Sequence, residues 1–162
     1  MKIIFFGNAD FGLETLEALI HSSQHELLAI VTNPDKRINR NKKNKINPIK
    51  QVGLSNEIPV IEQEDISDED FLAKLKGFKA DIFLVIAYKI IPESIYNIPK
   101  YKAINLHASI LPKYRGASPI QRALMNGDKK TGLSTFFINN KIDKGELIYQ
   151  EEVSIKDTDS FY

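Results

Sequence analysis

The residues of this chain with the most obvious capacity for chemistry are an asparagine, a histidine and an aspartate. Asn105 and His107 end a short apolar segment, and the alternation of side chains along a strand places both on the same face. Asp143 lies in a turn-rich link, two residues before Gly145. An amide and a protonated imidazole can donate hydrogen bonds to an oxyanion, and a carboxylate can orient the histidine and help to move a proton. These groups are the ones that acyl transfer to an amine requires.

Plainer interpretations of the same residues stay open. Asn105 and His107 could be hydrogen-bonded residues that only cap a strand, and an acid shortly before a glycine is usually a turn former. As a catalytic group, Asp143 would have to reach His107. The sequence has no cysteine, and no serine in a nucleophile-elbow motif, so direct transfer without an acyl-enzyme is the simpler chemistry.

Apolar periodicity predicts the elements that must position these groups. A buried strand at residues 2–6, a helix at 10–20 capped by Asp10, and a second strand at 26–31 are typical of a parallel sheet with right-handed crossovers. In such a sheet, ligands bind at the carboxyl ends of the strands, where Asn105 and His107 lie. Further elements are predicted as follows: a helix at 48–52 that ends near Gly53, a strand at 59–61, a helix that carries Phe71, Leu72 and Leu75, strands at 81–87 and 103–106, a helix that Ser118 caps and that runs to about Asn126, and strands at 133–138 and 146–153.

The composition is that of a folded protein of the cytoplasm. The 162 residues are 43% hydrophobic and 27% charged, which suits one domain with a core. The absence of cysteine favours a reducing compartment. The apolar start at residues 1–6 is too short for a signal peptide, and the longest apolar run, residues 82–88, is too short to span a bilayer. We therefore expect no membrane partner, and with one plausible histidine ligand we expect no metal site.

The basic residues are unevenly distributed. Seven of them fall within residues 36–50 without a single acid, and the rest of the chain has 15 basic and 21 acidic residues. Residues 33–47 have no apolar periodicity and are predicted to form a long exposed loop. A basic segment on an otherwise acidic chain indicates one contact surface for a polyanion, although a merely solvated loop remains an alternative.

Two segments resemble a known family. The sequence NLHASILPKYRG at residues 105–116 closely resembles the signature loop of the 10-formyltetrahydrofolate-dependent formyltransferases, and DKG at 143–145 resembles their later Asp-x-Gly motif. The resemblance extends over residues 1–162 and implies a doubly wound, mostly parallel, Rossmann-like formyltransferase domain of α/β class. It implies 10-formyltetrahydrofolate as formyl donor, and Asn105, His107 and Asp143 as the catalytic residues. It implies folate contacts at Tyr88, Lys89, Ile90, Ile91, Pro92 and Ile142. It implies a substrate loop that includes Ser109, Leu111, Pro112, Tyr114, Arg115 and Gly116.

Within the family, residues 6–11 and 117–124 are similar to the members that formylate methionyl initiator tRNA. In those members the basic loop reaches the acceptor end of the tRNA, so the resemblance implies tRNA contacts, through phosphates, by Arg37, Arg40, Lys42, Lys43 and Lys45. Those members continue well past Tyr162, through a last helix and a separate tRNA-binding barrel. We therefore expect this chain to be a truncated catalytic domain, and we expect it to be a monomer.

Three alternatives remain at this point. A sugar-nucleotide N-formyltransferase would use the same three residues and the same folate donor. A glycinamide formyltransferase would do so too, but such a basic loop is not expected of either. A non-enzymatic RNA-binding module would need only the basic loop and could dispense with Asn105, His107 and Asp143.

Overall fold

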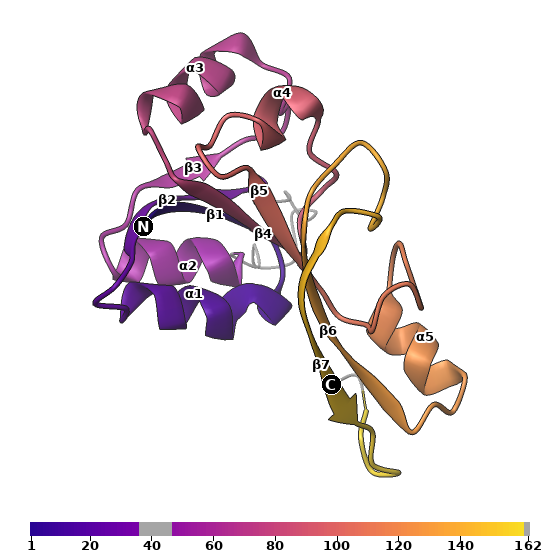
Figure 1. Ribbon diagram of the computed structural model, residues 1–162. Helices are drawn as coiled ribbons and strands as arrows, with labels where there is room; N and C mark the ends of the chain where they lie inside the picture. Colours follow the sequence, from indigo (N-terminus) through magenta and orange to yellow (C-terminus); the bar gives the residue numbers. More distant parts are fainter. Residues whose placement is uncertain (36–46, 161–162) are drawn as a thin grey trace, which may run out of the picture. The chain divides into compact units, whose positions relative to one another are not determined.

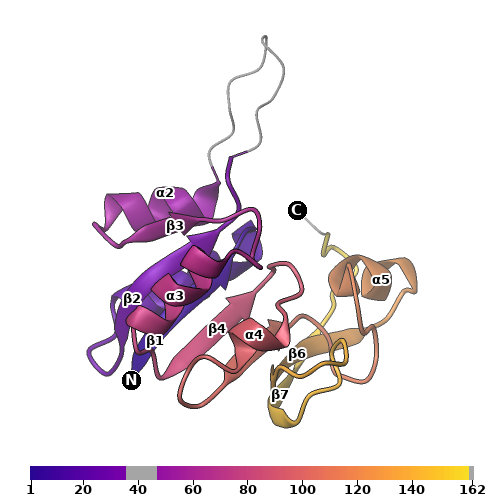
Figure 2. The same ribbon diagram turned by 90° about the horizontal axis from the view of Figure 1, so that it is seen from above.

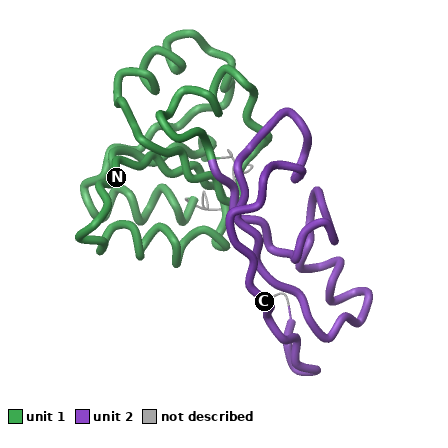
Figure 3. The backbone as a smooth tube through the Cα atoms, viewed as in Figure 1, with its two compact units in different colours: residues 1–103 green, residues 104–162 purple. Residues whose placement is uncertain are grey.

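The computed structural model describes residues 1–35 and 47–160 (Figure 1). The chain divides into two compact units, drawn in green and purple in Figure 3. Unit 1 is Met1–Ala103 and unit 2 is Ile104–Tyr162. Among the described residues, no helix has both the length and the apolar character that crossing a bilayer requires.

Unit 1 contains a parallel sheet whose strand order is β3-β2-β1-β4. Its strands are β1 (Lys2–Gly7), β2 (Glu26–Thr32), β3 (Val60–Glu62) and β4 (Ile82–Ile86). The chain runs outward from β1 to β2 and β3, and then returns to pair β4 with the other side of β1. The direction of winding therefore reverses between β1 and β4. In doubly wound sheets, ligands bind at this reversal, beyond the carboxyl ends of the strands.

Helices cover both faces of this sheet (Figures 1 and 2). A 3-10 turn (Asp10–Gly12), α1 (Leu13–Ile20) and α2 (Pro48–Ser55) lie on one face, and α3 (Glu69–Gly77) and α4 (Glu93–Tyr96) lie on the other. Phe5, Phe6 and Phe83 are fully buried between these layers. Burial on both faces explains why β1 and β4 are continuous apolar runs and do not alternate.

Two local predictions for unit 1 are wrong. Asp10 does not cap α1, because residues 10–12 form a 3-10 turn first and no side chain caps either helix start. Helix α2 does not end near Gly53 but continues to Ser55. A Cβ at Gly53 would lie 2.7 Å from a methyl of Val60 and 2.8 Å from one of Ile30, so the glycine lets the helix pack closely on the sheet. Gly53 was predicted to end the helix, but it is needed because only a residue without a side chain allows α2 to pack this closely on the sheet.

The described part of unit 2, residues 104–160, contains antiparallel strand pairing and one helix. Strand β5 (Ala103–His107) begins at the last residue of unit 1 and pairs antiparallel with β6 (Lys130–Phe137), which pairs antiparallel with β7 (Leu147–Ser154). Helix α5 (Pro119–Met125) connects β5 to β6. Ser118 occupies the predicted cap position and Pro119 is the first helical residue, but the Ser118 backbone is left-handed, with φ of 57°, and its hydroxyl makes no capping hydrogen bond.

Candidate active site

The three residues predicted to be catalytic all lie in unit 2. His107 is the last residue of β5, opposite Ser134 of β6, and Asn105 lies two residues earlier on the same strand, opposite Phe136. Asp143 lies in the link between β6 and β7. Its carboxylate oxygen Oδ2 is 3.6 Å from Nδ1 of His107, and the two side chains are only 8% and 12% exposed. The fold thus brings together two groups that lie 36 residues apart in the sequence.

The loop after β5 wraps around this pair. The backbone carbonyl of Tyr114 lies 2.9 Å from Nε2 of His107, and the backbone N–H of Gly116 donates to Oδ2 of Asp143 at 2.7 Å. Nε of Arg115 donates to the backbone carbonyl of Asp143 at 2.8 Å. Each of the two acid–base groups is therefore oriented by the main chain of the same short loop.

The Tyr114 carbonyl determines where His107 carries its proton. A carbonyl oxygen can only accept, so Nε2 must be the protonated nitrogen of the neutral ring. Nδ1, the nitrogen that faces Asp143, then holds a lone pair in the neutral ring and a proton in the imidazolium. His107 can donate a hydrogen bond from Nδ1 to a negative oxygen only as the imidazolium, for which the adjacent Asp143 carboxylate is the natural counter-ion.

The Asp-x-Gly motif has a steric explanation. Asp143 has a left-handed backbone with φ of 48°, a conformation that Asp tolerates better than most residues. At Gly145 an added Cβ would overlap the backbone carbonyl of Phe137, so no larger residue fits. Phe137 N–H donates to the carbonyl of Glu146 at 2.9 Å, and the Asn139 amide donates to the carbonyl of Lys144 at 3.2 Å. These contacts close the link tightly and fix the position of Asp143.

A second hydrogen-bond network holds the first half of the loop after β5. The buried hydroxyl of Ser134 donates to the carbonyl of Ser109 at 2.6 Å and accepts from the N–H of Leu111 at 3.1 Å. The Ser109 hydroxyl donates to the carbonyl of Lys113 at 2.5 Å, and the Gln150 amide donates to the carbonyl of Leu111 at 3.0 Å. Sequence reasoning missed Ser134, which lies inside a predicted strand and carries no motif.

The residues predicted to form a substrate loop therefore divide into two groups. Ser109, Leu111 and Tyr114 are buried, whereas Pro112 and Arg115 are exposed and Gly116 is intermediate. The buried members hold the loop in place. A contact of this loop with substrate remains a prediction for its exposed members.

The segment predicted to contact folate, residues 88–92, directly follows β4 in unit 1, at the point where the winding reverses. The ring of Tyr88 lies edge-on to Phe6, with centroids 5.7 Å apart. Its hydroxyl oxygen is buried and has no hydrogen-bond partner among the described residues. Burial raises the pKa of Tyr88 to about 12, so the hydroxyl remains a neutral donor at physiological pH.

The other predicted folate residues differ in their availability. The Lys89 ammonium donates to the carbonyls of Gln63 and Glu64, at 3.2 and 2.7 Å, and so ties two loops of unit 1 together. Ile90 is 72% exposed and Ile91 is buried. Pro92 is exposed and caps α4, and Ile142 is exposed in unit 2 beside Asp143.

The described residues next to the basic segment form a polar cluster. Nζ of Lys50 lies 2.7 Å from Asp35 and 2.6 Å from Glu62, and the hydrogen bond from Lys50 lowers the pKa of Asp35. Asp35 also accepts from the N–H of Asn47, whose side chain caps α2. Lys50, which the sequence groups with the basic segment, is thus neutralised by two carboxylates. The predicted tRNA-binding residues Arg37, Arg40, Lys42, Lys43 and Lys45 lie outside the described residues.

Potential metal ligands do not cluster in the described part of the chain. Residues 1–35 and 47–160 contain no group of three or more His, Cys, Asp or Glu side chains that could hold a metal ion. The donor set around His107 consists instead of one imidazole, one carboxylate and backbone groups.

These elements define an α/β protein with a doubly wound sheet and a buried histidine–aspartate pair at a strand end. The sequence profile described as Formyl transferase matches residues 1–161, and the chain belongs to that family. The family resemblance inferred from residues 105–116 and 143–145 is thereby confirmed.

Comparison with curated proteins identifies close relatives. The chain is 40% identical over 160 residues to a methionyl-tRNA formyltransferase of Bacteroides fragilis, a match that covers 99% of this chain and 49% of that protein. It is 46% identical over 159 residues to a methionyl-tRNA formyltransferase of Thermodesulfovibrio yellowstonii, covering 98% and 51%. The chain thus spans about half the length of the curated relatives it matches.

Comparison with solved structures confirms the predicted fold. A phosphoribosylglycinamide formyltransferase from Bacillus halodurans superposes with a TM-score of 0.80 at 21% identity, covering 99% of this chain and 83% of that chain. A formyltetrahydrofolate deformylase from Pseudomonas syringae superposes with a TM-score of 0.75 at 21% identity, covering 98% and 52%. At this level of identity the likeness concerns the fold, which is the Rossmann-like α/β architecture predicted from the sequence.

Proposed function

We propose that this chain carries the catalytic site of an enzyme that transfers a formyl group from 10-formyltetrahydrofolate to the amino group of methionyl initiator tRNA. Membership of the formyl transferase family supports the reaction class. Identity of 40% or more to proteins named methionyl-tRNA formyltransferase supports the acceptor. The observation that carries the chemistry is the buried contact between His107 and Asp143, with the histidine oriented by the Tyr114 carbonyl.

The proposed reaction is a direct transfer. The amine nitrogen of the acceptor attacks the formyl carbon, a new C–N bond forms, and the bond from that carbon to the donor nitrogen breaks. The Asn105 amide and the Nδ1–H of protonated His107 stabilise the negative charge that develops on the formyl oxygen. Asp143 accepts the proton that the attacking amine loses, and the leaving nitrogen takes up a proton. Within the described part of the chain the Asn105 side chain forms no hydrogen bond, so its amide is free to donate.

The residues at the end of β4 fit the folate donor. The donor brings the formyl group, and a pterin ring needs apolar contacts together with a few oriented polar groups. Tyr88 offers a buried hydroxyl that no described residue pairs with, and Ile90 offers an exposed apolar side chain. We propose that the donor contacts Tyr88, Ile90, Ile91 and Pro92. For unit 2 we propose, as a separate point, that Ile142 also contacts the donor. Because Lys89 is held by two carbonyls, we propose that it supports this segment and does not bind the donor through its ammonium group.

The first experiment identifies the acceptor. Labelled 10-formyltetrahydrofolate is incubated with the full-length protein and either methionyl initiator tRNA or an amino-sugar nucleotide. Label on the tRNA supports the proposal. Label on the sugar nucleotide would keep the donor and the catalytic residues but overturn the acceptor, and binding of tRNA without any transfer would favour a non-enzymatic RNA-binding module.

The catalytic assignment is tested by His107→Ala and Asp143→Asn. Each should lower the rate of formyl transfer by about 10²- to 10⁴-fold, the usual contribution of a positioned acid–base group. Binding of tRNA, measured by filter retention, should remain. His21→Ala removes an exposed histidine of unit 1 and is the matched control. Equal activity of His107→Ala and the control would contradict the assignment.

The basic segment is tested by the salt dependence of tRNA binding. Reversing the charges of Arg37, Arg40, Lys42 and Lys43 should weaken binding and flatten the plot of log affinity against log salt, because each lost phosphate contact reduces the slope by roughly 0.7 to 0.9. Lys50→Gln is the matched control, since this lysine is already paired with Asp35 and Glu62. An unchanged slope in the reversed variant would show that these residues do not contact phosphates.

Three further predictions remain proposals. The absence of cysteine supports a cytoplasmic location. A monomeric state is testable by light scattering. We also propose that residues 1–162 act as one catalytic domain that works together with a separate tRNA-binding barrel.

A further inference from the structure

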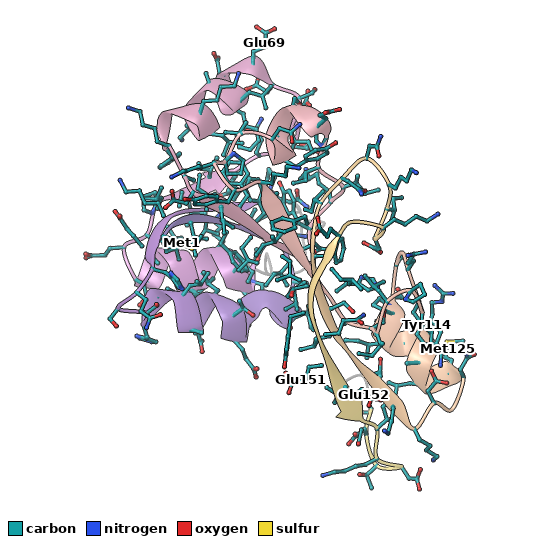
Figure 4. All side chains as sticks on the ribbon, viewed as in Figure 1. Met1, Glu69, Tyr114, Met125, Glu151 and Glu152 are labelled. Carbon is teal, nitrogen blue, oxygen red and sulfur yellow. The ribbon has the colours of Figure 1, made fainter. Side chains whose placement is uncertain are left out.

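The side chain of Tyr114 is anchored away from His107, at the far end of helix α5. Its hydroxyl donates to Oδ2 of Asp128 at 2.6 Å and accepts from the Asn126 amide at 2.6 Å. Both partners follow the last residue of α5, Met125, which is labelled near Tyr114 in Figure 4. Tyr114 is therefore held at two points: its hydroxyl is hydrogen-bonded to Asp128 and Asn126, and its backbone carbonyl is hydrogen-bonded to Nε2 of His107.

The backbone of Tyr114 has a strained conformation that the side-chain hydrogen bonds can maintain. Its φ is 57°, in the left-handed region that aromatic residues rarely adopt. Without a constraint the residue would relax towards negative φ, and its carbonyl would turn away from Nε2 of His107. The side chain is buried and its hydroxyl is fully paired, so the phenol resists that rotation.

We propose that Asp128 is a positioning residue for formyl transfer, acting through the Tyr114 hydroxyl and the Tyr114 carbonyl to keep the proton of neutral His107 on Nε2. This inference rests on the proposed function, and Asp128 itself touches none of the reacting atoms. Its consequence is that Nδ1, which faces Asp143, is the ring nitrogen that gains a proton when His107 becomes the imidazolium. Loss of the anchor would release a mixture of tautomers, in which Nδ1 is already protonated in part of the neutral population.

The groups around Asp128 provide a matched pair of variants. Nζ of Lys113 also donates to Oδ2 of Asp128, at 2.7 Å, and lies 5.1 Å from the centroid of the Tyr114 ring, but this lysine side chain is 58% exposed. Lys113→Gln removes the ion pair and keeps the tyrosine–aspartate hydrogen bond. Tyr114→Phe removes the hydroxyl and keeps the volume of the ring. Asp128→Asn keeps an oxygen that can accept from the hydroxyl, and Asp128→Ala does not.

The experiment reads the tautomer and the kinetics separately. Nitrogen-15 NMR of the histidine rings in the full-length protein reports which nitrogen of neutral His107 carries the proton, with exposed His21 as an internal reference. The wild type, Lys113→Gln and Asp128→Asn should show the Nε2–H form. Tyr114→Phe and Asp128→Ala should show mixed tautomers, and kcat should fall by about 10- to 100-fold with KM for donor and acceptor unchanged.

The outcomes are distinguishable. An unchanged Nε2–H spectrum in Tyr114→Phe overturns the proposal, as does an equal loss of kcat in Lys113→Gln. If Asp128→Ala lowers the melting temperature so far that the protein does not fold, the tautomer of His107 in Tyr114→Phe and in Asp128→Asn still tests the proposal. The NMR measurement needs no substrate, so a failure of formyl transfer to tRNA would overturn the proposed function and leave the tautomer test intact.

Discussion

Two strand ends of this protein, one predicted to contact folate and the other predicted to carry catalytic residues, are organised in opposite ways. After β4, residues 87–92 expose the side chain of Ile90 and leave a buried Tyr88 hydroxyl that has no hydrogen-bond partner within residues 1–35 and 47–160. After β5, the loop at residues 108–118 pairs the hydroxyls of Ser109 and Tyr114 and directs its backbone groups at His107 and Asp143. The first segment keeps hydrogen-bonding capacity available, and the second uses it internally.

The difference follows from what each segment must do. A buried unpaired hydroxyl costs free energy in the free protein, and a ligand that satisfies it regains that energy on binding. Groups that stabilise a transition state act best when they are already oriented, because no reorganisation is then needed during the reaction. A segment whose hydrogen-bonding groups are still unpaired suits ligand binding. A segment whose hydrogen-bonding groups are already paired and oriented suits catalysis.

The largest effect is expected at Gly145, in the link that positions Asp143. Gly145→Ala places a Cβ on the backbone carbonyl of Phe137, so the link must move and displace Asp143. A displacement of about 1 Å lowers the rate of a positioned reaction by about 10²-fold, and we expect at least that loss of kcat. Gly77→Ala is the control, since a Cβ there meets no atom within 4 Å. Full activity in Gly145→Ala would show that the position of Asp143 is not critical.

A smaller effect is expected at Ser134, which holds the loop after β5. Ser134→Ala removes the acceptor for Leu111 N–H and the donor to the Ser109 carbonyl in a fully buried place. Leaving such groups unpaired costs about 1–3 kcal/mol, which urea unfolding can measure. Ser154→Ala, at an exposed position on β7, should change stability little. An equal effect of the two variants would contradict the idea that the loop is held by internal hydrogen bonds.

The smallest effect concerns the unpaired hydroxyl of Tyr88. Its pKa is raised by burial from 10.0 to about 12, so above pH 10 the unfolded chain loses this proton before the folded chain does. The contribution of Tyr88 to stability is therefore present below pH 10 and is lost as the pH rises towards 12. Because it removes a buried unpaired hydroxyl, Tyr88→Phe should be at least as stable as the wild type at pH 7, and it should lose less stability between pH 10 and 12, as measured by urea unfolding. An equal or steeper loss in the variant would show that burial does not raise the pKa of Tyr88.

The kinetics of Tyr88→Phe test whether the Tyr88 hydroxyl binds the donor. If Tyr88 binds the donor, Tyr88→Phe should raise KM for 10-formyltetrahydrofolate and leave kcat nearly unchanged, because the hydroxyl contributes to binding in the ground state and the transition state alike. A fall in kcat at constant KM would instead place Tyr88 among the residues that act on the transition state.

The sequence was sufficient for the features that residue types and local periodicity encode. The strand–helix–strand order of residues 2–32 and the apolar strand at 82–86 follow from patterns of buried side chains. The family motifs singled out Asn105, His107 and Asp143, two of which the fold brings into contact. Where local signals failed, as at Gly53 and Ser118, tertiary packing or a left-handed backbone had replaced the usual capping role.

Only the tertiary structure decided how the candidate site is held together. The groups that orient His107 and Asp143 are the backbone carbonyl of Tyr114 and the backbone N–H of Gly116, and every residue type other than proline carries both kinds of group. Ser134 and Asp128 act from β6 and from the end of α5, and the distances that make them important appear only when the chain is folded. A sequence specifies which side chains are present, whereas the direction of a main-chain hydrogen bond depends on dihedral angles that distant contacts determine.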